Sequence, residues 1–219
     1  NLIADAMEPY LSASGIQFTR NTPDMTAASS IAASNAGNYD LHLALHSNAV
    51  GSSQQPTVRG IDVYYYPTSV NGKRFADIAA NNLQLIYPLP GMVKTVPTTR
   101  LGEVARVRAP GVLIELGYHD NPLDADWIRN NINNIAENLV LSLTEYFGIP
   151  FNMPQPIQVG YVSTEGSNLN IRSRPDISAP IIGKIPNGSE IVIYNRLPEW
   201  DLVGYSGVIG YSSNRYISA

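Results

Sequence analysis

Two short apolar stretches of this 219-residue sequence each carry a side chain that can do acid–base or metal chemistry. His46 follows the alternating leucines of residues 41–45, and Glu115 lies inside the apolar run 112–116. Both runs have the length and composition of buried β-strands. Because open α/β sheets place their ligands where strands end, His46 is a candidate metal ligand or catalytic residue, with a packed histidine as the alternative.

His42 and His46 lie four residues apart, a spacing that would place both imidazoles on one face of a helix as a metal-binding pair. The strict alternation of leucines favours a strand instead. In a strand, four residues span about 13 Å, which is too far for two imidazoles to share one ion. We therefore predict that His42 is a packed or capped histidine.

Glu115 is surrounded by apolar residues on a strand that is expected to be central. Burial of a carboxylate without a partner is costly and raises its pKa. A cation nearby or a role in proton transfer would account for a glutamate at this position. The alternative is a buried salt bridge, for instance to Arg106 or Arg108.

The elements that must position these side chains follow from the periodicity of the apolar residues. Before residue 148, helical and strand patterns alternate, which is typical of an α/β domain with a mostly parallel sheet flanked by helices. Helices are expected at residues 3–14, 26–35, 72–86 and 124–147, and strands at 16–20, 41–45, 61–65 and 112–116.

A proline-rich segment, residues 149–156, interrupts this periodicity and predicts a linker after a domain that spans residues 1–148. Beyond it, residues 157–219 contain short strand patterns separated by turn residues, which predicts a small all-β barrel. Its strands are expected at residues 160–162, 169–172, 181–185, 190–194, 200–203 and 207–211.

Charge and composition exclude several classes of partner. The net charge is −4 and basic residues are scattered singly, so no nucleic-acid partner is expected. No stretch approaches the roughly 20 apolar residues that span a bilayer, so no membrane insertion is expected. The sequence has no cysteine, which leaves His, Asp and Glu as ligands for any zinc ion.

The stretches around His46 and Glu115 resemble the zinc-dependent N-acetylmuramoyl-L-alanine amidases of bacterial cell-wall turnover (the Amidase_3 type). The resemblance covers about residues 1–148. It is carried by residues 1–4 and 15–21, and by LHSNA at 45–49, GIDVYY at 60–65 and PGVLIELGYHDN at 110–121. It implies peptidoglycan as the partner, hydrolysis of the amide between N-acetylmuramic acid and L-alanine, and an extracellular or cell-wall location.

By the same resemblance, His46 is the last of three zinc ligands, and Glu115 is the catalytic glutamate that activates a zinc-bound water. Asn48, His119 and Glu103 are candidate substrate contacts. Capping explains His119 equally simply, and Glu103 is expected in the first place to be a solvated surface residue. No cofactor besides zinc is implied.

The sequence departs from the family at the first two zinc ligands, a histidine and a glutamate, which would lie upstream of Asn1. Glu8 lies too far along the first helix to replace the glutamate. Three hypotheses follow: a zinc amidase completed by upstream residues, a non-catalytic wall-binding protein on a degenerate amidase fold, and a different zinc peptidase on a related scaffold.

Residues 157–219 resemble a bacterial SH3 domain, through LNIRSRP at 169–175, IGKIPNGS at 182–189, WDLVGY at 200–205 and IGY at 209–211. This resemblance implies a module that binds wall peptides or docks on its own enzyme domain. Trp200, Tyr205 and Tyr211 are candidate wall contacts, and the alternative for each is a place in the aromatic core of the barrel.

Overall fold

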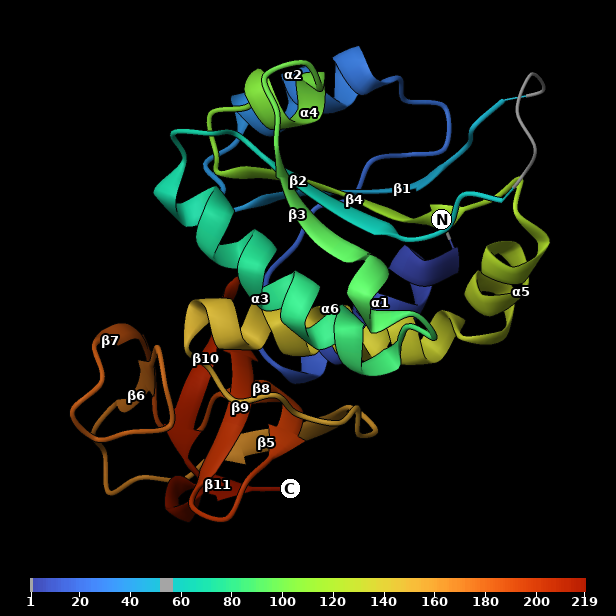
Figure 1. The fold of residues 1–219 in the computed structure, drawn as a ribbon. Coiled ribbons are helices and arrows are strands. Elements are labelled where there is room, and N and C mark those ends of the chain that lie inside the picture. The colour runs from blue at the N-terminus through green and yellow to red at the C-terminus, as the bar shows by residue number, and fades with distance from the viewer. Residues whose placement is uncertain (1, 52–56) are drawn as a thin grey trace. The chain divides into compact units, whose positions relative to one another are not determined.

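The computed structural model describes residues 2–51 and 57–219 (Figure 1). Two compact units divide the chain. The first contains Arg20–Phe147 and the residues up to Met7, and the second contains Glu8–Thr19 and Gly148–Ala219. Helix α1 (Leu2–Ala13) contributes residues to both units.

The first unit is a layered α/β structure. Its strands are β1 (His42–Asn48), β2 (Ile61–Tyr65), β3 (Val93–Pro97) and β4 (Gly111–Tyr118), in the order β1-β4-β2-β3 within the sheet. Its other helices are α2 (Ala27–Ala36), α3 (Val70–Ile86), the 3-10 helix η1 (Pro90–Met92), α4 (Gly102–Ala105), α5 (Pro122–Asn130) and α6 (Ile132–Phe147).

The sheet is mostly parallel, as the sequence predicts. β1 pairs with β4, and β2 with β3, in parallel, whereas β2 and β4 run antiparallel. β4 lies between β1 and β2, which confirms the prediction of a central strand around Glu115. Because β2 is reversed, its first residues lie at the same edge of the sheet as the last residues of β1 and β4.

Helices cover both faces of the sheet, with α2 and α4 on one side and α3 and α6 on the other (Figure 1). A small apolar cluster joins Ala44 and Leu113 to Val104 of α4, with Tyr64 packed against it. Since side chains alternate between the faces of a strand, the even-numbered residues of β1 and β2 and the odd-numbered residues of β4 face α4. His46 and Glu115 belong to this set.

The sequence predictions differ from the structure in a divided helix, two unexpected short elements and a strand that does not form. The expected helix 124–147 is two helices, α5 and α6. Asn131 separates them with φ −124° and ψ 22°, while its side chain donates a hydrogen bond to the carbonyl of Trp127 at 2.8 Å. β3 and α4 were not expected, since both segments are too short to show a clear periodicity of apolar residues.

The expected strand 16–20 is wrong: among the described residues it pairs with no strand. The backbone leaves α1 through Gly15, which has φ +78°, and the amide of Ile16 donates to the carbonyl of Leu11 at 2.9 Å. The start of this segment therefore closes the helix end rather than joining a sheet.

The second unit is built around an antiparallel sheet. Its strands follow the order β11-β5-β8-β9-β10-β6-β7, and all of the pairings described are antiparallel. They are β5 (Gln158–Val162), β6 (Leu169–Arg172), β7 (Ile181–Ile185), β8 (Glu190–Arg196), β9 (Trp200–Tyr205), β10 (Val208–Ser213) and β11 (Ile217–Ser218), with the 3-10 helix η2 at Asn214–Tyr216. This confirms the small all-β domain.

Residues 8–19 pack within the second unit. Asn152 donates its backbone amide to Ser14 Oγ and its side-chain amide to the carbonyl of Ala13, both at 3.1 Å. The ring of Tyr10 stacks on Phe151 with 6.0 Å between centroids. The division at a 149–156 linker, which leaves residues 8–19 in the first domain, stays a prediction.

Both faces of β9 are buried, which is unusual for a strand of a small barrel. Val203 belongs to the barrel core, while its neighbours Asp201 and Leu202 are also 0% exposed. Leu202 points away from Val203, and a Cβ atom on Gly15 would lie 2.9 Å from Leu202 Cδ1. The segment after α1 therefore covers the outer face of β9.

Within the described part of the chain, none of the helices combines the length and apolar content required to cross a bilayer.

Candidate active site

The candidate site lies on the face of the sheet that α4 covers, at the edge where β1 and β4 end. His46 of β1 and Glu115 of β4 are register partners in the parallel ladder, and Asp62 of β2 is the register partner of Glu115 on its other side. Three polar residues therefore stand in one row across adjacent strands. The sequence prediction that His46 and Glu115 come together at neighbouring strand ends is confirmed.

Glu103 of α4 lies beside the two histidines of β1. Its Oε2 is 3.1 Å from Nε2 of His46, and its Oε1 is 3.8 Å from Nε2 of His42. The two histidines lower the pKa of Glu103 to about 2, His42 contributing most. The hydrogen bond that the His46 ring makes to the carboxylate of Glu103 is the main cause that raises the pKa of His46. Glu103 therefore faces His46 and is not the solvated residue that the sequence suggested.

His42 is packed, as expected from its position within the strand. Its Nδ1 lies 3.0 Å from Ser34 Oγ of α2, and its side chain is 12% exposed. Its Nε2 has no hydrogen-bond partner among the described residues but lies 3.8 Å from Oε1 of Glu103, so His42 is placed beside Glu103 rather than toward a substrate.

Glu115 is partly buried and has an unsatisfied oxygen. Within residues 2–51 and 57–219, its Oε2 is buried without a hydrogen-bond partner. Burial is the main cause that raises its pKa; Asp62 adds to the effect, and His46 and His119 oppose it. The alternative salt bridge to Arg108 is not formed, since the Arg108 guanidinium donates to the carbonyl of Asn35 at 3.1 Å. A carboxyl group in this state is suited to exchanging a proton with a reactant.

Asp62 completes the polar row and Tyr64 lies beside it on β2, and sequence reasoning assigned a role to neither. Tyr64 donates its hydroxyl to Asp62 Oδ2 at 3.3 Å, and burial, with Asp62 next in importance, raises the pKa of Tyr64 to about 12. The available signal was the alternation of polar and apolar residues along β2. It became informative only once β2 was known to run antiparallel to β4.

The turn after β4 brings His119 against the end of β1. The amide of His119 donates to the carbonyl of Asn48 at 2.9 Å, and its Nδ1 lies 3.1 Å from Ser47 Oγ. The side chain of Asn48 accepts from the amide of Ala49 at 2.8 Å. His119 is exposed at this edge and Asn48 is partly exposed, which leaves both available to a substrate.

A complete metal site is not formed by the described residues, in which no group of three His, Asp or Glu side chains is arranged to hold an ion. His46 is suitably placed to supply one nitrogen, and the unpartnered oxygen of Glu115 beside it is suited to a cation or a proton. The described residues therefore fit part of a zinc centre and no more.

The three aromatic residues proposed for wall binding differ in their accessibility. Tyr211 is 2% exposed and has almost no surface to present, whereas Trp200 and Tyr205 are half-buried. Tyr205 lines a groove of about 230 Å³ with Tyr194 and Val208. The burial of Tyr211 favours its place in the packing of the barrel.

Comparison with known proteins decides the family. The sequence profile of the N-acetylmuramoyl-L-alanine amidases matches residues 2–145. The chain belongs to this family of amidases. The profile of the bacterial SH3 domain matches residues 167–218, which confirms the second resemblance and points, with the amidase domain, to peptidoglycan as the partner.

Solved structures of amidases share the fold. An N-acetylmuramoyl-L-alanine amidase from Clostridium difficile 630 is 18% identical, with a TM-score of 0.59 over 67% of this chain and 81% of that one. The amidase AmiC2 of Nostoc punctiforme is 21% identical, with a TM-score of 0.57 and the same coverages. The catalytic domain of the CD27L endolysin targeting Clostridia Difficile is 22% identical, with a TM-score of 0.53 over 65% of this chain and 79% of that domain. Among curated proteins, none matches the chain significantly.

Membership of the amidase family supports peptidoglycan hydrolysis and does not favour the non-catalytic alternative. The motifs that carried the resemblance in the sequence, residues 45–49 and 110–121, form the two strand ends of the candidate site.

Proposed function

We propose that Glu115 is the acid–base residue with which this amidase hydrolyses the bond between N-acetylmuramic acid and L-alanine of the stem peptide. The observation that carries the proposal is the ladder pairing of Glu115 with His46 and Asp62, together with the unpartnered Oε2 of Glu115. A carboxylate with a raised pKa accepts a proton from water near neutral pH and returns it readily.

In this proposal, Glu115 acts twice. Its Oε2 first accepts a proton from the attacking water, and then donates that proton to the departing amine of L-alanine. His46 next to it favours the ionised form of Glu115, and Asp62 favours the protonated form. The opposing neighbours keep both protonation states accessible.

Zinc is the proposed cofactor, with His46 as one of its ligands. When bound, zinc would polarise the scissile carbonyl and lower the pKa of a water molecule. Glu103 faces Nε2 of His46, which leaves Nδ1 for the metal, and a carboxylate behind a ligating histidine is a common arrangement.

Substrate contacts are proposed for His119 and Asn48, whose side chains border the same edge of the sheet. Glu103 is assigned instead to holding His46. In the barrel, Trp200 and Tyr205 are the proposed wall contacts, with Tyr205 in its groove. Since peptidoglycan lies outside the cytoplasm, we propose an extracellular or cell-wall location.

Product analysis on purified peptidoglycan tests the proposal. The intact protein is expected to release stem peptides with a new amino-terminal L-alanine, which amine labelling and mass spectrometry detect. Glu115→Gln is expected to reduce the rate by about 10²- to 10⁴-fold. Glu165→Gln, the same change at an exposed position in the second unit, is the matched control and should retain full activity.

The products also separate the competing functions. Peptides cleaved within the stem would indicate a peptidase, and wall binding without any cleavage would indicate the non-catalytic alternative. Full activity of a folded Glu115→Gln variant would remove Glu115 from the mechanism.

A further inference from the structure

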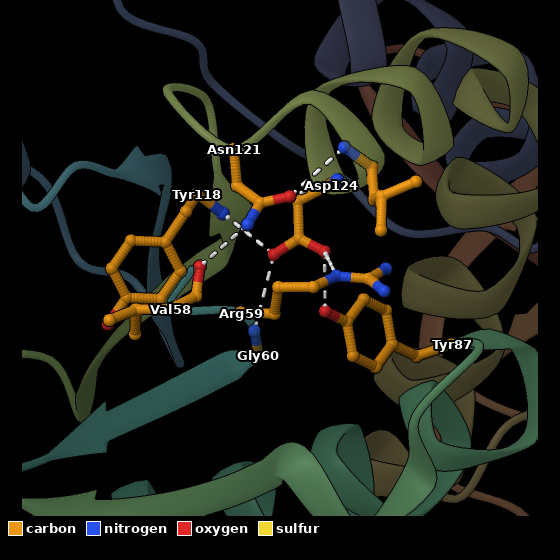
Figure 2. A network of polar contacts seen from close by, with 8 residues as sticks. Val58, Arg59, Gly60, Tyr87, Tyr118, Asn121 and Asp124 are labelled. Atoms are coloured by element: carbon orange, nitrogen blue, oxygen red, sulfur yellow. Dashed lines mark hydrogen bonds and ion pairs between the residues drawn. The ribbon is translucent and has the colours of Figure 1, made fainter. Parts of the chain in front are cut away.

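Asp124 of α5 is a fully buried carboxylate outside the row of site residues, with a side chain that is 0% exposed. Figure 2 shows its carboxylate at the centre of a polar network that joins α5 to three other parts of the first unit. These are the start of β2, the end of β4 and Tyr87, the residue that caps the end of α3.

The two oxygens of Asp124 have different partners. Oδ1 accepts from Arg59 Nε and from the Tyr87 hydroxyl, each at 2.7 Å. The partners of Oδ2 among the described residues are backbone donors, the amides of Gly60 at 3.2 Å and Tyr118 at 3.1 Å. The side-chain partners of Oδ1 stabilise the buried charge, whereas the partners of Oδ2 fix the course of two strands.

Those two strands carry the candidate site. Gly60 precedes Ile61–Asp62, the first residues of β2, and Tyr118 is the last residue of β4, three positions after Glu115. β2 and β4 pair so that Asp62 stands opposite Glu115. One carboxylate oxygen therefore bonds to both strands close to the point where the two acidic residues meet.

The backbone at the end of β4 is shaped to admit this carboxylate. Gly117 has φ +88°, a conformation that side chains disfavour, and a Cβ atom there would lie 3.1 Å from Asp124 Oδ2. The absence of a side chain at Gly117 gives Oδ2 its access to the amide of Tyr118.

Neighbouring residues of the same turn hold the connection between β1 and β2 at both ends. Asp120 Oδ2 accepts from the amides of Val50 and Gly51 at 2.9 and 3.2 Å. Asn121 donates its side-chain amide to the carbonyl of Val58 at 3.2 Å. The turn after β4 thus fixes the chain just after β1 and just before β2, the two strands that flank Glu115 in the sheet.

A buried ion pair is weak evidence for stability, because apolar side chains of similar volume often stabilise a fold as well or better. What apolar side chains cannot supply is an acceptor for the amides of Gly60 and Tyr118. We propose that Asp124 is a positioning residue, whose Oδ2 holds β2 and β4 in the alignment that places Asp62 beside Glu115. This inference rests on the proposed role of Glu115.

Paired substitutions separate positioning from stability. In Arg59→Met/Asp124→Asn, the Asn oxygen accepts from the two amides while its NH2 group donates to Tyr87, so kcat should stay within about threefold of wild type. In Arg59→Met/Asp124→Leu, the side chain has a similar branched shape but no acceptor. There kcat should fall by about 10²-fold with little change in KM, since small displacements at a catalytic group have effects of this size.

Asp124→Glu provides a second comparison that retains the charge. Its longer side chain moves the carboxylate by one methylene group, so kcat is expected to fall while the protein remains folded. Hydrogen exchange at the amides of Gly60 and Tyr118 reports directly whether their hydrogen bonds to residue 124 are formed. Exchange should be slow in wild type and in the Met/Asn variant, and faster in the Glu and Leu variants.

The outcomes distinguish the two proposals. Wild-type kcat and slow exchange in a folded Asp124→Glu variant would overturn the positioning role, and so would loss of kcat in the Met/Asn variant. The positioning role would also be overturned if kcat fell in proportion to the fall in melting temperature in every variant, whether or not the acceptor is kept. Failure of the wild-type protein to release stem peptides would reject the proposed function, while the exchange data would still test the position of the strands.

Discussion

The carboxylate of Glu103 lies 3.1 Å from Nε2 of His46, although the two residues are 57 positions apart in the sequence. The contact gives His46 a fixed orientation, because one ring nitrogen is directed at α4 and the other is left for a reactant or a metal.

Replacement of Glu103 by Gln is expected to lower the pKa of His46 toward its ordinary value of 6.5, because the charged hydrogen-bond partner is lost. Imidazole NMR signals recorded over a pH titration measure the change. The chain has three histidines, and His119, which contacts Ser47 rather than Glu103, supplies the reference signal. An unchanged His46 titration would mean that the contact does not form in solution.

Glu115→Gln is expected to change activity and stability in opposite directions. Folding raises the pKa of Glu115 above 4.5, so the folded protein binds this proton more tightly than the unfolded chain. Its charge therefore lowers stability increasingly as pH rises from 4.5 through the folded-state pKa. Because solvent partly screens this charge, its removal should raise stability at pH 7 by no more than about 1 kcal/mol, or about 2–4 °C in Tm, while the rate of hydrolysis falls by about 10²- to 10⁴-fold.

Calorimetry of both proteins at pH 4 and pH 7 checks this expectation, since the increase in Tm caused by Glu115→Gln should be larger at pH 7. A Tm that falls at both pH values would show that the carboxylate has a stabilising partner in solution.

Asp201→Asn is expected to stabilise the second unit near neutral pH. The carboxylate is 0% exposed and both of its oxygens lack a hydrogen-bond partner among the described residues, while Arg196 lies 3.7 Å away. Burial is the main cause that raises the pKa of Asp201 above 3.8, so stability should fall as pH rises through the window between 3.8 and the folded-state pKa.

The variant should remove that dependence and gain of the order of 1 kcal/mol above the window, because a neutral amide does not carry the cost of ionisation in the buried site. Thermal melts of the two proteins across pH 3–8 provide the measurement. Parallel curves would indicate that Arg196 already neutralises the charge.

Gly15→Ala is expected to destabilise the second unit more than Gly188→Ala. Both glycines have φ +78°, so each substitution carries a similar backbone strain of about 1–2 kcal/mol. A methyl group at Gly15 would in addition lie 2.9 Å from Leu202 Cδ1, whereas nothing lies within 4 Å at Gly188. The difference in unfolding free energy, measured with denaturant, should be about 1–3 kcal/mol, which is typical of overpacking. Equal losses would place Gly15 away from Leu202 in solution.

Local patterns predicted the fold where they were strong. β2 was predicted to the residue, because its alternating side chains are flanked by Gly60 and Pro67. The direction of β2 was not predicted, since strand direction depends on pairing between distant segments rather than on local periodicity. The break at Asn131 was missed because the apolar stripe continues on both sides of it.

The residues of the candidate site also fall into those that local sequence patterns predicted and those that depend on tertiary packing. His46 and Glu115 stood out because each is a polar residue at or within an apolar run. Glu103 was named only as a candidate substrate contact, and Asp62 and Asp124 were not named, because the contacts of all three depend on how β2, α4 and α5 pack in three dimensions. Asp124 illustrates the limit: an acidic residue in the first turn of a helix is ordinary in sequence, and only its complete burial marks it.

The covered outer face of β9 affects how the second domain could be transferred to another protein. Residues 8–19 group with the barrel, and Leu202 is buried partly because the segment near Gly15 lies against it. A fusion that transplants residues 148–219 alone would expose Leu202 to water. Domain-swapping experiments that transplant the SH3-like domain with and without the 8–19 peptide would therefore test the boundary expected at the proline-rich segment.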